Sequence, residues 1–189
     1  MGGLPAWLLL KTGADGLKLR TYEPQYIAAV DRWWGALLAA AGPYAYSKGG
    51  PIVVTQIENE YGSFGHCDTN PADAKYMNHL LSLATAYLGA PMTEMLYSTI
   101  DGGEGKAAAK LHDGNPWKGD PRVLATVDGS LAPWKGGYAS SFVNQKEFNA
   151  PGRSPKMWSE LWVGWFTVCA CTSTTLRVPM RHSTRTELR

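Results

Sequence analysis

Acidic and amide side chains follow a short apolar run in the first third of the chain. The run from Ile52 to Ile57 leads into Glu58-Asn59-Glu60, and Glu160 follows another strand-like run much later. Hydrolysis of a glycosidic bond needs two carboxyl groups, one that protonates the leaving oxygen and one that attacks the sugar or activates water. We therefore predict an acid/base site that pairs Glu60 with Glu160.

The choice between Glu58 and Glu60 depends on where the predicted strand ends. Two residues apart on a strand, their side chains would share one face of the sheet. Glu60 lies nearer the C-terminal end of the strand, where α/β barrels hold their chemistry. We therefore expect Glu60 to be the reacting group and Glu58 to support it by hydrogen bonding. Asn59 is expected to form a hydrogen bond with a sugar hydroxyl.

The surroundings of the two glutamates are rich in aromatic residues. A carboxyl group that acts as an acid at neutral pH needs a raised pKa, which it gains in a poorly solvated place near a second carboxylate. Tyr61, Trp158, Trp162 and Trp165 could form that low-polarity wall, and we assign Trp162 to substrate binding together with Asn59. The alternative is that these tryptophans belong to the hydrophobic core, where large aromatic side chains dominate.

Other kinds of site find little support in the residues. The four histidines show no metal-ligand spacing, so we predict no metal. No nucleotide-binding glycine motif and no serine nucleophile elbow is present. Cys67, Cys169 and Cys171 do not form a disulfide framework, and we expect them to be ordinary thiols.

The elements that position these residues alternate along the chain. Strands are predicted over 52–57, 92–100, 122–128 and 156–159, and helices over 24–41, 71–88, 104–111 and 140–148. This alternation is typical of β/α units around a parallel sheet. Short apolar runs bounded by glycine and proline suit strands that are covered on both faces.

The helix over 24–41 has the clearest signals. Pro24 suits its first turn, Thr21 or Glu23 could cap it, and Gly42-Pro43 would end it. Apolar residues recur along it at spacings of three and four and form a wide stripe that is expected to face the core. The stripe consists of Tyr26, Ile27, Val30, Trp33, Trp34, Leu37, Leu38 and Ala41.

The composition is that of an ordinary folded domain. Of the 189 residues, 44% are hydrophobic and 11% are aromatic, which is enough for a sizeable core, and the length favours one domain. A net charge of +2 is too small to predict a nucleic-acid partner. No stretch reaches the roughly 20 apolar residues of a membrane span, so no membrane partner is expected.

The stretch from Gly49 to Tyr61, GGPIVVTQIENEY, resembles the signature of the glycoside hydrolase family 35 β-galactosidases over thirteen positions. Residues 2–8, 26–34 and 158–166 resemble further blocks of the family in the same order. The resemblance covers about residues 1 to 166. It implies a TIM barrel, an α/β fold, and an enzyme that releases terminal β-linked galactose from oligosaccharides, glycans or cell-wall polymers.

The resemblance also implies roles for particular residues. Glu60 would be the acid/base at the end of the fourth barrel strand, and Glu160 the nucleophile at the end of the seventh. Asn59 would contact the sugar 2-hydroxyl. The implied mechanism is a double displacement that retains the anomeric configuration, and no cofactor is implied. The expected partner is a galactoside oligosaccharide or polysaccharide.

Both ends of the chain depart from the family pattern. In the family, three strands and a sugar-contacting acid precede the block that matches Met1 to Pro5, and an eighth strand and β-sandwich domains follow residue 166. Residues 167–189 show no helical or strand periodicity and carry four spaced arginines, so we expect an unrelated, disordered basic tail. The N-terminus is not a convincing signal peptide, whereas family members usually work in lysosomes, vacuoles, cell walls or outside the cell.

We therefore predict two parts: a partial TIM-barrel catalytic domain over 1–166, roughly strands four to seven with their helices, and an irregular tail over 167–189. Half a barrel leaves its edge strands unpaired, so we expect a truncated product with impaired activity. The alternative is a non-catalytic galactoside-binding or vestigial barrel fragment. A glycosidase of the same barrel clan with another sugar specificity is a third hypothesis.

Overall fold

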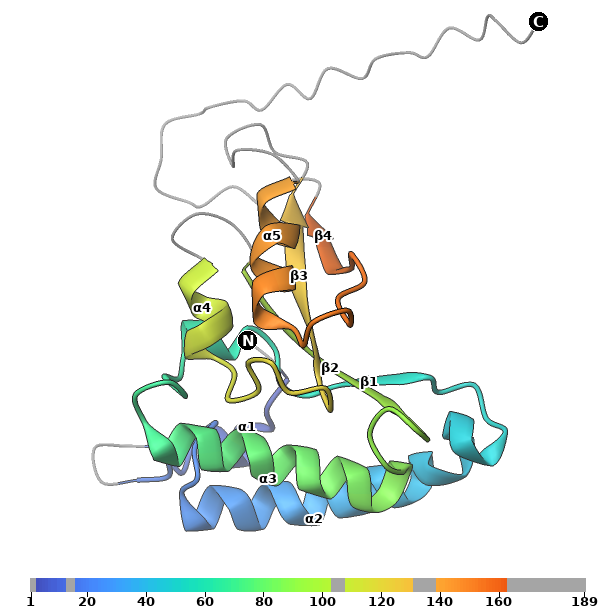
Figure 1. Ribbon diagram of the computed structural model, residues 1–189. Helices are drawn as coiled ribbons and strands as arrows, with labels where there is room; N and C mark the ends of the chain where they lie inside the picture. Colours follow the sequence, from blue (N-terminus) through green and yellow to red (C-terminus); the bar gives the residue numbers. More distant parts are fainter. Residues whose placement is uncertain (1–2, 13–15, 103–107, 131–138, 163–189) are drawn as a thin grey trace, which may run out of the picture.

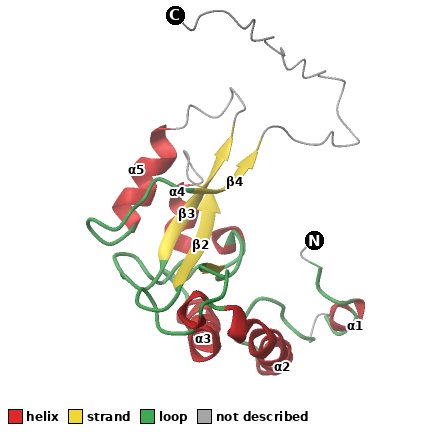
Figure 2. Cartoon of the chain, turned by 90° about the vertical axis from the view of Figure 1, so that its right-hand side faces the viewer, coloured by secondary structure: helices red, strands yellow, loops and turns green. Residues whose placement is uncertain are grey.

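The computed structural model describes residues 3–12, 16–102, 108–130 and 139–162. Its centre is a parallel sheet whose four strands follow one another in chain order. The arrowheads of β2, β3 and β4 point the same way, away from α2 and α3 (Figure 2). The sheet curls like part of a barrel. Its strands are β1 (Val54–Gln56), β2 (Leu96–Gly102), β3 (Leu124–Ser130) and β4 (Trp158–Trp162).

Two long helices, α2 (Pro24–Ala41) and α3 (Pro71–Leu88), lie side by side beneath the sheet (Figure 1). Both have the bounds that the sequence predicts. The Glu23 carboxylate accepts hydrogen bonds from the backbone N–H groups of Gln25 and Tyr26 and so caps α2. Thr21, the other candidate cap, instead donates to the carbonyl of Lys18.

The remaining helical segments are short. The helix predicted over 104–111 is described from Ala108 and ends at Asp113, while residues 104–107 lie outside the described part of the chain. The helix predicted over 140–148 is found within one residue. The short segments are α1 (Ala6–Leu9), η1 (Gly42–Tyr44), η2 (Tyr46–Lys48), η3 (Tyr61–Ser63), α4 (Ala108–Asp113) and α5 (Ala139–Phe148). No helix in the described part of the chain is long and apolar enough to cross a membrane.

The core has two parts. The larger one gathers side chains of α2, α3 and the strands, including Tyr61, Tyr76, Met77 and Tyr97, all of which are buried. The smaller one forms where α4 and α5 pack on the sheet, and consists of Leu111, Ala125, Val127 and Phe148. Because these helices cover β2 and β3, the middle of the sheet is the best enclosed region.

The apolar stripe predicted on α2 is wider than the face that the helix buries. Tyr26, Ile27, Val30 and Leu38 are buried, but the side chain of Trp33 is 63% exposed and Leu37 is also exposed. The reason is geometric, because α2 contacts α3 along one side only and the stripe continues around the helix.

The prediction that the first strand is covered on both faces is wrong. β1 is only three residues long, and its first residue, Val54, is exposed, as is Val53 just before it. Among the described residues β1 pairs with β2 alone, so it forms an edge of the sheet. An edge strand has neighbours on one side only, and its apolar residues are therefore left partly uncovered.

Candidate active site

Acidic residues stand at the C-terminal ends of all four described strands. Glu60 follows β1, Asp101 is the second-last residue of β2, Asp128 lies near the end of β3, and Glu160 lies in β4. Because the strands are parallel, these ends lie along the same edge of the sheet. The sequence pattern indicates Glu60 and Glu160 as site residues but does not single out the two aspartates between them.

Three of these acids form a cluster. Carboxylate oxygens of Glu60, Asp128 and Glu160 all lie within 4.8 Å of one another, and all three residues are half-buried. The structure thus brings together the two glutamates that the sequence pairs. It also adds Asp128 to them.

An irregularity between β3 and β4 determines which residues meet there. Val127 pairs with Trp158, so regular pairing would place Ser159 opposite Asp128. The register shifts between Val127 and Asp128, and Glu160 takes that position instead. Ser159 forms a short hydrogen bond with the hydroxyl of Thr126. This bulge therefore aligns Asp128 with Glu160, as bulges near active sites often redirect side chains.

The turn that carries Glu58 and Glu60 has an unusual backbone. Both residues adopt left-handed conformations, with φ of 59° and 47°. Such conformations are costly for residues other than glycine and persist only when their surroundings hold them. The prediction that the two glutamates share one face of a strand is wrong, because they lie in this turn and their carboxylates have different neighbours.

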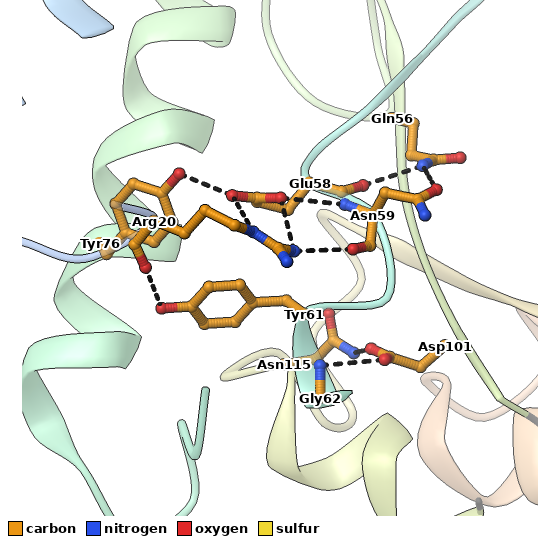
Figure 3. A network of polar contacts seen from close by, with 9 residues as sticks. All are labelled: Arg20, Gln56, Glu58, Asn59, Tyr61, Gly62, Tyr76, Asp101 and Asn115. Carbon is orange, nitrogen blue, oxygen red and sulfur yellow. Dashed lines mark hydrogen bonds and ion pairs between the residues drawn. The ribbon is translucent and has the colours of Figure 1, made fainter. Parts of the chain in front are cut away.

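Glu58 belongs to a half-buried polar network rather than to the carboxylate cluster (Figure 3). Arg20 donates to its carboxylate from Nη2 at 3.0 Å and from Nε at 3.3 Å, and the hydroxyl of Tyr76 donates at 2.6 Å. Burial raises the pKa of the Tyr76 hydroxyl, which keeps this donor protonated. Glu58 therefore has a fixed position and direction.

The same network holds the rest of the turn. Arg20 Nη2 donates to the carbonyl of Asn59 at 2.7 Å, and the hydroxyl of Tyr61 donates to the carbonyl of Arg20 at 2.8 Å. Gln56 donates to the Asn59 side-chain oxygen at 2.9 Å (Figure 3). The side chain of Asn59 is exposed, and its amide nitrogen has no hydrogen-bond partner among the described residues. That nitrogen is available to a ligand.

Asp101 holds the turn after β1 through a hydrogen bond to its backbone. It is fully buried, and it accepts hydrogen bonds from the backbone N–H of Gly62 at 3.0 Å and from the side chain of Asn115 at 2.9 Å (Figure 3). Burial raises its pKa to about 7, and the charge of Glu60 acts in the same direction, against the effect of these hydrogen bonds. Asp101 thus links the end of β2 to the residues that follow Glu60.

Asp128 has a strongly perturbed carboxyl group. Burial, a hydrogen bond with Glu60, and the charges of Glu60, Glu160 and Asp101 together raise its pKa to about 8. A signal for Asp101 and Asp128 was present in the sequence, since each precedes a glycine near the end of a predicted strand. An acid before a glycine is common in turns, so this signal alone did not select them.

The predicted aromatic wall is only partly described. Tyr61 is enclosed in the core, and Trp158 stacks on Phe142 of α5 with ring centroids 4.9 Å apart. The backbone of Trp162 pairs with Ser130 at the end of β4. The side chain of Trp162, the whole of Trp165 and the predicted tail over 167–189 lie outside the described residues.

Within the described residues, two groups of side chains have the spacing that a metal ion would need. One is the carboxylate cluster itself, and the other is His66, Asp68 and Asp113, of which the first two are exposed. Carboxylate oxygens suit hard cations such as Mg²⁺ and Ca²⁺. Acidic groups at this spacing also occur without a cation, so we assign no metal to either group.

Comparisons with known proteins point to one family. Residues 1–184 match the model of the Glycosyl hydrolases family 35. Beta-galactosidase 8 of Oryza sativa subsp. japonica is 41% identical over 167 residues, which are 88% of this chain and 22% of the rice protein. Beta-galactosidase 17 of Arabidopsis thaliana is 41% identical over 169 residues, 88% of this chain and 21% of that protein.

An animal relative gives a similar result. The Beta-galactosidase of Canis lupus familiaris is 38% identical over 165 residues, 87% of this chain and 21% of the dog protein. The chain therefore spans about a fifth of the length of the curated relatives that it matches.

Proposed function

This chain belongs to glycosyl hydrolase family 35, and from that premise we propose that it hydrolyses terminal, non-reducing β-D-galactose residues from β-galactosides. The relatives that support the substrate are named as beta-galactosidases. The substrate would be an oligosaccharide or polysaccharide that ends in galactose. The four strands would correspond to strands four to seven of a TIM barrel. Residues 1–166 would form this part of the catalytic domain.

The observation that carries this proposal is the approach of Glu60 to Glu160. Their carboxylate oxygens lie within 4.8 Å of each other. Retaining glycosidases hold the two carboxyl groups about 5–5.5 Å apart, whereas inverting enzymes need roughly 6.5–9.5 Å to admit a water molecule. Because oxygens of Glu60 and Glu160 approach each other this closely, we propose the retaining double displacement.

In this mechanism each glutamate has one role. Glu60 protonates the glycosidic oxygen while a carboxylate oxygen of Glu160 attacks the anomeric carbon, so that the aglycone leaves and a galactosyl ester forms on Glu160. Glu60 then removes a proton from water, which attacks the same carbon and releases galactose. The free amide nitrogen of Asn59 would donate to the sugar 2-hydroxyl. Trp162 would contribute a surface for the sugar ring.

Covalent trapping tests the proposal without requiring rapid turnover. A galactoside with fluorine at position 2 and an activated leaving group slows hydrolysis of the ester, so that mass spectrometry of peptides can locate it. We expect the adduct on the peptide that contains Glu160, and its loss in Glu160→Gln. Glu147→Gln is the matched control, because Glu147 is an exposed residue of α5 outside the carboxylate cluster. An adduct on another residue, or none, would contradict the proposal.

Turnover itself is expected to be weak. The chain spans about a fifth of the length of the relatives that it matches, and its four-stranded sheet leaves β1 as an exposed edge. An aryl β-galactoside assay of the 189-residue chain should show slow hydrolysis that Glu160→Gln abolishes. Rapid hydrolysis that survives Glu160→Gln would show that another group acts as the nucleophile.

A second candidate function is galactoside binding without hydrolysis. The exposed edge strand β1 favours it, because an open sheet leaves the carboxylate cluster less shielded from water than a closed barrel would. Galactose would then bind with unchanged affinity in Glu60→Gln, as measured by calorimetry, and no adduct would form in the trapping experiment.

A further inference from the structure

We propose that Asp128 is a positioning residue that shares a proton with Glu60 and so keeps a proton available to the acid of the site at neutral pH. The inference rests on the proposed function, since it concerns the group assigned there as acid/base. It assigns a role to a residue that lies on a different strand and outside the predicted catalytic pair.

The first support is the arrangement of the three carboxylates. The bulge after Val127 places Asp128 opposite Glu160, and carboxylate oxygens of both lie within 4.8 Å of Glu60. Three ionised carboxylates at this spacing would repel one another strongly in a partly enclosed place. A proton held between two of them replaces a repulsion with a hydrogen bond.

The second support is an unsatisfied atom. Oδ1 of Asp128 is buried and has no hydrogen-bond partner among the described residues. A buried carboxylate oxygen without a donor is costly. If Asp128 and Glu60 share one proton, the shared hydrogen bond satisfies part of this need, because one carboxyl group becomes a donor toward the other.

The third support is the sign of the surrounding charge. The groups that act on Asp128 are Glu60 from the turn after β1, Asp101 from β2 and Glu160 from β4, and all of them are acids. Together with burial they raise the pKa of Asp128 to about 8. When acids interact this closely, the titration belongs to the pair rather than to either residue. Asp128 therefore holds a proton at neutral pH, with a carboxylate oxygen of Glu60 close to it.

The chemical consequence is a store of one proton beside the leaving group. When Glu60 gives its proton to the glycosidic oxygen, the pair loses that proton and the aglycone leaves neutral. The water that hydrolyses the galactosyl ester then returns one proton to the pair, so the cycle ends as it began. In these reaction steps Asp128 exchanges a proton only with Glu60 and forms no bond to the sugar.

Titration by NMR tests the shared proton directly on the 189-residue chain. Side-chain carboxyl carbons of carbon-13-labelled aspartate are followed against pH, and Asp128→Asn identifies the resonance of Asp128. We expect this resonance to titrate well above the ordinary range of aspartate, and its midpoint to fall by about one pH unit or more in Glu60→Gln, since removal of a neighbouring charge removes a cause of the raised pKa. Asp68→Asn, on the exposed surface, is the control and should leave the midpoint unchanged.

The two possible failures can be told apart. If Asp128 titrates like an exposed aspartate, or if Glu60→Gln leaves its midpoint unchanged, the shared proton is disproved whether or not the trapped adduct forms. If the coupling is present but no adduct forms, the proposed function fails instead. Where hydrolysis is measurable, Asp128→Asn should move the alkaline limb of the pH–rate profile to lower pH, and an unchanged limb would also overturn the inference.

Discussion

Arg20 is the residue that joins the first part of the chain to the turn carrying Glu60. It precedes α2, yet its guanidinium reaches the carboxylate of Glu58 and the carbonyl of Asn59, while its own carbonyl accepts from Tyr61. Charge-assisted, two-pronged contacts of this kind define both distance and direction. They stabilise the left-handed backbone at Glu58 and Glu60, which would otherwise relax.

At the same scale, Asp101 should make stability depend on pH. Burial raises the pKa of Asp101 to about 7, from the ordinary value of 3.8. Between pH 4 and 7 the folded protein holds a proton there that the unfolded chain has released. The free energy of unfolding therefore falls as pH rises through this window, by up to about 1.4 kcal/mol per pH unit.

Urea denaturation at several pH values measures this dependence. Asp101→Asn should make the fall between pH 4 and 7 shallower, and Asp128 would account for part of the slope that remains because its pKa is also raised. The exposed Asp68→Asn should leave the slope as it is in the unmodified chain. An unchanged slope in Asp101→Asn would show that Asp101 titrates normally in the folded protein.

At the scale of elements, the close approach of η3 to α4 positions the residues after Glu60. Gly62 lies where the two elements meet, and a Cβ atom there would overlap the carbonyl of Lys110 and its neighbouring backbone atoms. Gly62 also donates to Asp101 from its backbone. Backbone atoms cannot rotate away as a side chain would, so the two elements would have to separate.

Gly62→Ala should therefore destabilise the chain by about 1–3 kcal/mol, the usual cost of overpacking, and should weaken covalent trapping at Glu160. Gly35→Ala in α2 is the control, because a Cβ atom there meets only the hydroxyl of Tyr87 at 3.4 Å. That change should be neutral or stabilise the helix by up to about 1 kcal/mol. Urea denaturation measures both, and equal stability of the two variants would contradict the tight contact.

At the scale of the whole molecule, the sheet is open at β1. Val53 and Val54 at this edge are exposed, as is Leu96 on the neighbouring strand. Unpaired backbone groups next to apolar side chains favour association with other chains. Longer relatives provide additional chain, since this one spans about a fifth of their length.

We therefore expect the chain to self-associate as its concentration rises, which sedimentation velocity can follow. Val54→Lys should shift the distribution toward the monomer, because a charge on an edge strand opposes pairing. Ser82→Lys, on the exposed side of α3, adds the same charge away from the edge and should have little effect. A monomer at all concentrations, or an equal effect of both lysines, would contradict this expectation.

Features that depend on neighbours along the chain can be predicted from the amino-acid sequence alone. The bounds of α2 and α3 follow from Pro24, Pro71, the capping side chains and the glycines that end them, all within a turn of the positions they affect. The parallel arrangement follows from the alternation of strands and helices. The signature around Glu60 identified the family, and the domain boundary at residue 166 stays a prediction.

Which side chains lie in contact, by contrast, is set by the packing of elements that are distant in the sequence. Whether Glu58 or Glu60 faces Glu160 depends on contacts with Arg20 and Tyr76, which are far away in the sequence. The presence of Asp128 in the cluster depends on a one-residue shift of register between β3 and β4. Local patterns carry no information on such long-range contacts, because a strand side chain changes face with every residue and a single shift alters its neighbours.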